Sequence, residues 1–131
     1  MTIKGYYISM VKKARQSEEK AARWLRRKDF CILGRNRRFF GVEIDILARK
    51  AESEGNSETY YLVEVKSVAR RRYEAGYPPL SYRQWERYIQ AYRQWCSEIG
   101  KTPEVRFSLL IFDEKQEMID FIPGYFWADA S

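Results

Sequence analysis

Histidine is missing from this sequence of 131 residues, and cysteine occurs only twice. Without histidine, the chain cannot form a Ser-His-Asp or Cys-His catalytic arrangement, a zinc-hydrolase site or a nuclease site with a histidine base. Cys31 and Cys96 lack the paired spacing of a metal-binding motif, so we interpret them as small core residues in a reducing compartment. Any chemistry must therefore come from carboxylates, lysine, tyrosine or a hard metal ion bound by oxygen.

Long apolar runs are missing as well. No stretch approaches the roughly 20 apolar residues that cross a bilayer, and the first residues lack the apolar core of a secretion signal. We therefore expect a cytoplasmic protein with no membrane partner. We find no internal repeat, low-complexity tract or Pro/Ser-rich linker, which predicts a single domain over residues 1–131.

Basic charge is in excess, with a formal net charge of +6. It gathers in residues 1–50, which contain 14 Lys/Arg and 5 Asp/Glu. Such an excess favours a polyanionic partner, because each neutralised phosphate releases condensed counterions. A solvated surface would explain the same charge, so charge alone leaves both interpretations open.

Hydrophobic periodicity predicts an α/β fold. Apolar residues at three- and four-residue steps indicate helices, and β-branched and aromatic runs indicate strands. The predicted elements are a helix over 8–28, strands over 30–35, 42–48 and 60–68, a helix from the N-cap Ser81 to Gly100, and strands over 105–112 and 118–122. A polar loop over 50–58 should close a hairpin. This order predicts an αβββαβ core, with a mixed central sheet flanked by helices.

Glu18 is the first of three acidic residues at positions where apolar residues would be expected. On a helical wheel it lies near the middle of the apolar stripe, whereas Glu19 is turned about 100° away. A leaning helix end that lets Glu18 reach water is the alternative.

Asp45 and Glu64 are the other two. Strand alternation places Val42, Ile44 and Ile46 on one face and puts Asp45 on the other, together with Glu43 and Leu47; an exposed face would explain the acids without chemistry. Glu64 and Lys66 share one side of a strand that is hydrophobic on both faces, as central strands are. A buried Glu64–Lys66 ion pair would offset the cost of burying charge, but it would leave Asp45 unexplained.

An oxygen-ligand cage explains all three acids together. Asp45, Glu64, the backbone carbonyl of Val65 and Glu18 from the helix would bind Mg²⁺ or Mn²⁺. Such an ion lowers the pKa of a bound water and neutralises charge on a phosphodiester. Lys66 could position or deprotonate the attacking water and stabilise the transition state.

The acids and the lysine resemble a known pattern. Asp45 on one strand, followed by Glu64-Val65-Lys66 on the next, is similar to the PD-(D/E)XK nuclease superfamily, which includes restriction enzymes and archaeal Holliday-junction resolvases. A closer resemblance, over about residues 14–126, is to the YraN-like family. It is carried by Glu18 to Ala22, Asn36, Val42 to Leu47, Val63 to Lys66, Arg106-Phe107 and Phe126.

The resemblance implies a restriction-endonuclease-like fold. It also implies a Mg²⁺-dependent endonuclease that hydrolyses phosphodiester bonds in DNA, including branched or structured DNA, with Asp45, Glu64 and Lys66 as catalytic residues. The sequence departs from the family pattern at Val42, at Ser67-Val68 and at Gln84, and these departures bear on substrate choice. A non-catalytic nucleic-acid-binding module of the same fold is the main alternative, and an interaction protein that uses its aromatic residues is another.

Basic and polar residues frame the predicted site, and we expect nucleic acid as the partner, DNA ahead of RNA. Gln84 and Tyr88 resemble the Gln-x-x-x-Tyr signature of RecB-type nucleases, but Ser81 to Gln84 is also a capping box and Tyr88 suits a core. Tyr73 and Tyr77 could stack on unpaired bases. A homodimer would suit symmetric cutting of a junction. The expected nucleic-acid contacts are Arg35, Arg37, Arg38, Arg70, Arg71, Arg72, Arg83, Gln84, Arg87 and Tyr88.

Overall fold

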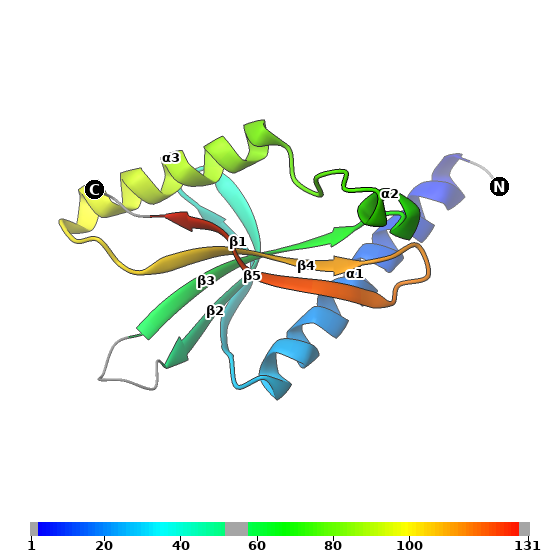
Figure 1. Cartoon of the computed structure of the whole chain (residues 1–131), viewed down its shortest axis with the longest axis horizontal. Coiled ribbons are helices and arrows are strands. Elements are labelled where there is room, and N and C mark those ends of the chain that lie inside the picture. Colours follow the sequence, from blue (N-terminus) through cyan, green and yellow to red (C-terminus); the bar gives the residue numbers. More distant parts are fainter. Residues whose placement is uncertain (1–2, 52–57, 129–131) are drawn as a thin grey trace.

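A five-stranded mixed sheet forms the centre of the protein, whose computed structural model describes residues 3–51 and 58–128 (Figure 1). The strands lie in the order β1-β2-β3-β4-β5, and in the described sheet only the β3–β4 pair is parallel. The elements are α1 (Ile3–Arg27), β1 (Cys31–Phe39), β2 (Val42–Ala51), β3 (Glu58–Ser67), α2 (Arg70–Glu74), α3 (Tyr82–Ile99), β4 (Val105–Phe112) and β5 (Met118–Ala128). This confirms the predicted order and the mixed sheet flanked by helices.

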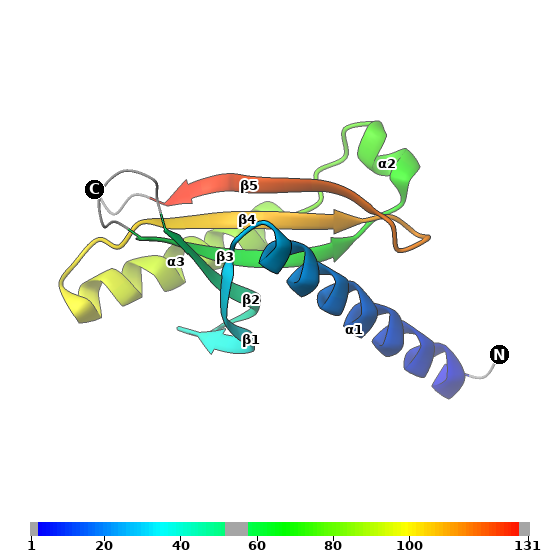
Figure 2. The ribbon, with the colours of Figure 1, turned by 90° about the horizontal axis from the view of Figure 1, so that it is seen from below.

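The two long helices cover opposite faces of the sheet (Figures 1 and 2). On one face, Ala21 and Leu25 of α1 pack in a core with Val63. On the other face, Tyr88 and Tyr92 of α3 belong to a second core. Because both faces are covered, β3 and β4 are apolar on both sides, as their sequences predict. No helix in the described parts of the chain is long and apolar enough to cross a membrane.

The ends of α3 form as the sequence predicts. The Ser81 hydroxyl accepts a hydrogen bond from the backbone N–H of Gln84 at 3.2 Å, which satisfies one of the free donors of the first turn. At the other end, Gly100 adopts the left-handed conformation with φ of 66°, and its N–H donates to the carbonyl of Cys96. The helix is therefore held in register at both ends, with Tyr88 facing the sheet.

Several boundaries differ from the predicted ones. The first helix starts at Ile3 instead of residue 8, β1 continues to Phe39, and β5 continues to Ala128. The short helix α2 was not predicted, since five residues are too few to show an apolar period. Most of the predicted 50–58 loop lies outside the described residues. Phe40 and Gly41, with φ of 47° and 88°, form the two-residue turn that joins β1 to β2.

The alternation predicted along β2 is wrong in one respect. Ile44 packs in the core on the α3 side, whereas Ile46 packs in the core on the α1 side, so the two do not share a face. The cause lies in the pairing, because β2 pairs with β3 only from Ile46 to Ala51. Before Ile46, β2 pairs with β1 alone. A strand released from one neighbour twists more strongly, and this twist turns the Ile44 side chain to the other layer.

Candidate functional site

Asp45 lies at the point where β2 separates from β3. The last paired residues on this side are Ile46 and Val63. Beyond them, the backbone N–H of Val65 donates to Oδ2 of Asp45 at 2.8 Å. The carboxylate therefore takes the place that a backbone carbonyl of β2 would occupy in a continued ladder. This hydrogen bond fixes the Asp45 side chain against the end of β3, where Glu64 and Lys66 also lie.

Glu64 is held from two sides. The hydroxyl of Tyr88 on α3 donates to Oε2 of Glu64 at 2.8 Å. Nζ of Lys66 lies 3.5 Å from the other carboxylate oxygen, Oε1. The Glu64 side chain is only 17% exposed and the Lys66 side chain 23%. The predicted placement of Glu64 and Lys66 on one face is confirmed by their contact, while Val65 between them packs against the α1-side core.

Burial, and after it the negative charge of Glu64, raise the pKa of the Asp45 carboxyl to about 7. Glu18 adds a smaller contribution in the same direction, while the hydrogen bond from Val65 and the charge of Lys66 oppose it. The same surroundings raise the pKa of Tyr88, first through burial and then through the negative charge of Glu64. Tyr88 therefore stays a hydrogen-bond donor, and the site concentrates negative charge where water solvates it poorly.

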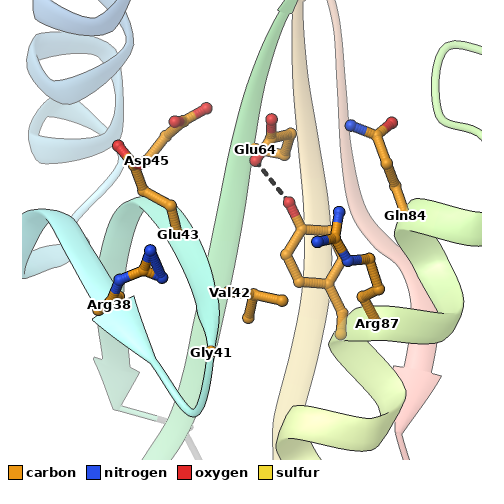
Figure 3. Close-up of a pocket in the computed structure, with 9 residues that line it drawn as sticks. Arg38, Gly41, Val42, Glu43, Asp45, Glu64, Gln84 and Arg87 are labelled. Carbon is orange, nitrogen blue, oxygen red and sulfur yellow. Dashed lines mark hydrogen bonds between the residues drawn. The ribbon is translucent and has the colours of Figure 1, made fainter.

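A pocket of about 450 Å³ opens beside the two acids. Figure 3 shows Asp45 and Glu64 on the two diverging strands, Arg38 on the β1–β2 hairpin, and Arg87 on α3. Arg38 and Arg87 thus add positive charge to a pocket whose inner wall is acidic. The full lining is Arg38, Gly41, Val42, Glu43, Asp45, Glu64, Gln84, Arg87 and Tyr88.

Glu18 and Glu19 of α1 both reach β1, where they contact different residues. Oε2 of Glu18 accepts a hydrogen bond from the Asn36 side chain at 3.3 Å, and Glu18 contributes to the raised pKa of Asp45. Glu19 pairs with Arg35 at 2.7 Å, which lowers the pKa of the Glu19 carboxyl, and it is not among the groups that shift the pKa of Asp45. Over residues 3–51 and 58–128, however, no three acidic or cysteine side chains come close enough to form a metal-binding cluster. Asp45 and Glu64 share the pocket, and Glu18 does not line it.

The predicted nucleic-acid contacts fall into three groups. Four of them line the pocket: Arg38, Gln84, Arg87 and Tyr88. Two have acidic partners elsewhere: Arg35 binds Glu19, and Arg70 binds the buried Asp113 at 2.9 Å. The remaining four, Arg37, Arg71, Arg72 and Arg83, are exposed.

Gln84 and Tyr88 combine the two roles that the sequence leaves open. Gln84 belongs to the cap of α3 through its backbone N–H and also reaches the pocket. Tyr88 packs its ring 5.5 Å from that of Phe107, as a core residue does, and its hydroxyl binds Glu64.

Sequence reasoning missed Gly41 and Val42 as lining residues. The positive φ of Phe40 and Gly41 brings the hairpin turn to the pocket, and the Phe-Phe-Gly run between two strands was the available signal.

The fold and the pocket define a mixed α/β domain in which Glu43, Asp45 and Glu64 of two neighbouring strands line a pocket rimmed by arginine. The chain belongs to the family described as uncharacterised protein family UPF0102, whose model matches residues 17–112. It is similar to a UPF0102 protein of Leifsonia xyli subsp. xyli (strain CTCB07), with 33% identity over 89 residues that cover 68% of this chain and 70% of the relative. The matched range includes Glu18, Asp45, Glu64 and Lys66. The family assignment predicted from the sequence is thus confirmed, and the wider relationship to PD-(D/E)XK nucleases stays a prediction.

Proposed function

We propose that this protein is a metal-dependent nuclease that hydrolyses phosphodiester bonds in DNA. The observation that carries the proposal is the shared pocket of Asp45 and Glu64, with Lys66 3.5 Å from Glu64. Neither acid is explained by the fold alone, because a sheet at this position would be more stable with apolar side chains. Two close acids suit a cation, and the arginines at the rim suit the phosphate that such a cation would bind.

The donor set fits Mg²⁺ or Mn²⁺. Both carboxylates are hard oxygen donors, and Mg²⁺ needs only one or two of them because it keeps several waters. The N–H and C=O groups of one strand residue point to the same edge of the strand. Because the N–H of Val65 points toward Asp45, the carbonyl of Val65 is on that same edge, where β2 separates from β3. A bound ion would supply a water of lowered pKa and neutralise charge on the phosphodiester. It would also relieve the repulsion that raises the pKa of Asp45.

Each neighbouring residue has a definite task in this proposal. Tyr88 holds Glu64 through its hydroxyl, and the Val65 N–H orients Asp45. Lys66 carries a positive charge next to Glu64, from which it can exchange a proton with water or stabilise negative charge that develops on the phosphate. Arg38 and Arg87 would bind phosphate oxygens, which gives affinity without base specificity.

A nucleic-acid-binding module of the same fold is the second candidate. The observation in its favour is that, in the described ranges, no third acidic side chain completes a metal-binding cluster with Asp45 and Glu64. Such a module would use Arg38 and Arg87 without hydrolysis. Metal dependence separates the two candidates, since only the nuclease needs both acids ionised around a cation.

A cleavage assay with matched variants tests the proposal. Labelled linear, branched and single-stranded DNA and RNA would be incubated with Mg²⁺, with Mn²⁺ or with a chelator. We expect metal-dependent cleavage of DNA, and a loss of at least about 100-fold in Asp45→Asn, Glu64→Gln and Lys66→Ala. Glu98→Gln, an equivalent change at an exposed position of α3, should cleave normally.

Metal titration by calorimetry supplies an independent measurement. Lys66→Ala should still bind the ion, because lysine is no ligand, whereas Glu64→Gln should bind it weakly. Cleavage that survives in Glu64→Gln or in the chelator would refute the proposal. Salt-dependent DNA binding with no cleavage of any substrate would favour the binding module instead.

A further inference from the structure

A second cavity, of about 540 Å³, lies past the end of β3. Its lining begins with Ser67, the residue that directly follows Lys66, and continues with Val68. The other walls come from α2 and from the loop that leads to α3, which Figure 1 shows beyond the tip of β3. The lining consists of Ser67, Val68, Ala69, Arg72, Tyr73, Tyr77, Pro78, Leu80 and Ser81. The cavity thus begins on β3 three residues after Glu64, which lines the acidic pocket.

The walls of this cavity are mainly apolar and aromatic. Tyr77 is 56% exposed, so part of its ring is accessible from the cavity. The guanidinium of Arg72 lies 4.4 Å from the centre of the Tyr77 ring and adds positive charge there. Tyr73 is fixed by the hydrogen bond that its hydroxyl donates to Asp120, and Leu80 is buried in the α3-side core. An open aromatic ring beside a cation, on a rigid apolar wall, suits a flat base that carries a phosphate.

We propose that this cavity receives an unpaired nucleobase, which stacks on Tyr77, from the strand whose phosphodiester lies at Asp45 and Glu64. The proposal rests on the nuclease function proposed above and adds the substrate class. A base inside a duplex is stacked on both neighbours, and it must leave the stack to enter a side cavity. Nucleic acids with an unpaired nucleotide next to the cut, such as ends, flaps and branch points, are therefore preferred over continuous duplex.

Binding measurements with two substrates test the stacking site. A blunt DNA duplex would be compared with a duplex that carries a short single-stranded extension and the same number of phosphates, by fluorescence anisotropy without metal. Tyr77→Ala should weaken binding of the extended substrate about 5-fold to 150-fold, the usual effect of losing one stacked base. It should leave the blunt duplex unchanged. Circular dichroism checks that the variant folds.

Two further variants serve as controls. Tyr77→Phe keeps the ring and should retain the preference for the extended substrate. Tyr82→Ala removes another open aromatic ring, 73% exposed, that does not line the cavity, and it should bind like the wild type. A 2-aminopurine in the extension should be quenched by the wild type and less so by Tyr77→Ala.

The two proposals fail in different ways. If Tyr77→Ala has no effect, or weakens binding of both substrates equally, the stacking site is refuted while cleavage by the wild type can still be intact. If the wild type prefers the extended substrate through Tyr77 but cleaves nothing, the stacking site stands and the nuclease function falls. A wild-type protein that binds neither substrate at any salt concentration refutes both.

Discussion

Replacing Asp45 with asparagine should stabilise the metal-free protein at neutral and alkaline pH. Burial and the charge of Glu64 raise the pKa of Asp45 from 3.8 to about 7, so the folded protein disfavours the ionised carboxylate. Asparagine has a similar shape, keeps an oxygen that can accept the Val65 hydrogen bond, and carries no charge. The variant therefore imitates the protonated form at every pH.

The magnitude follows from the difference between the folded and unfolded pKa. As pH rises through about 4, the unfolded chain releases the Asp45 proton while the folded protein retains it until about pH 7. The free energy of unfolding of the wild type therefore falls over this interval and stays level above it. With about 1.4 kcal/mol for each pH unit, the total loss is about 4 kcal/mol, of which about 3 kcal/mol falls between pH 5 and pH 8. The asparagine variant lacks this loss.

Urea and thermal unfolding from pH 5 to pH 8.5, in the presence of a chelator, would measure the effect. The advantage of Asp45→Asn over the wild type should grow with pH and reach roughly 10 °C in Tm at pH 8. Added Mg²⁺ should reverse the order, because the ion stabilises only the protein that binds it. Glu98→Gln should follow the wild type throughout. An advantage of equal size at pH 5 and pH 8 would refute the reasoning, because it would mean that the Asp45 charge is not disfavoured in the folded state.

Three further predictions concern residues around Asp45 and Glu64. Tyr88→Phe removes the hydrogen bond to Glu64 but keeps the ring, so it should lower the free energy of unfolding by about 2 kcal/mol and weaken metal binding. If the free energy of unfolding and the metal affinity both stay unchanged, the role of the hydroxyl is contradicted. Glu18→Gln should lower Mg²⁺ affinity several-fold in calorimetry because its charge reaches Asp45, whereas Glu19→Gln should leave it unchanged, and the reverse result would contradict the α1 register. Arg87→Ala should reduce the slope of log affinity for DNA against log salt by about 1, and an unchanged slope would remove Arg87 from the interface.

The family and the element order could be predicted from the sequence because both depend on local patterns. A regularly paired strand alternates its side chains with a period of two, and β3 pairs with β4 without interruption, so Glu64 and Lys66 share a face as predicted. A helix turns about 100° per residue, which separated Glu18 from Glu19 in the same way. Ser81 marked the start of α3, because a hydroxyl there satisfies a free backbone donor within the same turn. These residues were therefore identified without any knowledge of contacts.

Local sequence patterns could not predict contacts between distant parts of the chain. The hydrogen bond of Tyr88 to Glu64 joins residues 24 positions apart, and the ion pair of Arg70 with Asp113 joins residues 43 positions apart. Nothing near Arg70 in the sequence distinguishes it from Arg71, yet Arg70 is held by the buried Asp113 while Arg71 is exposed.

The sequence by itself determined which elements form and which polar side chains β3 and α3 carry on each face, because those properties depend on residue type and backbone period. The tertiary structure alone decided where β2 leaves β3 and how Asp45 is held there. That separation moves Ile44 and Ile46 to opposite layers and opens the pocket between the strands. Where β2 separates from β3 depends on how β2 packs against its two neighbouring strands and the two covering helices at the same time. No single segment of the sequence contains those contacts.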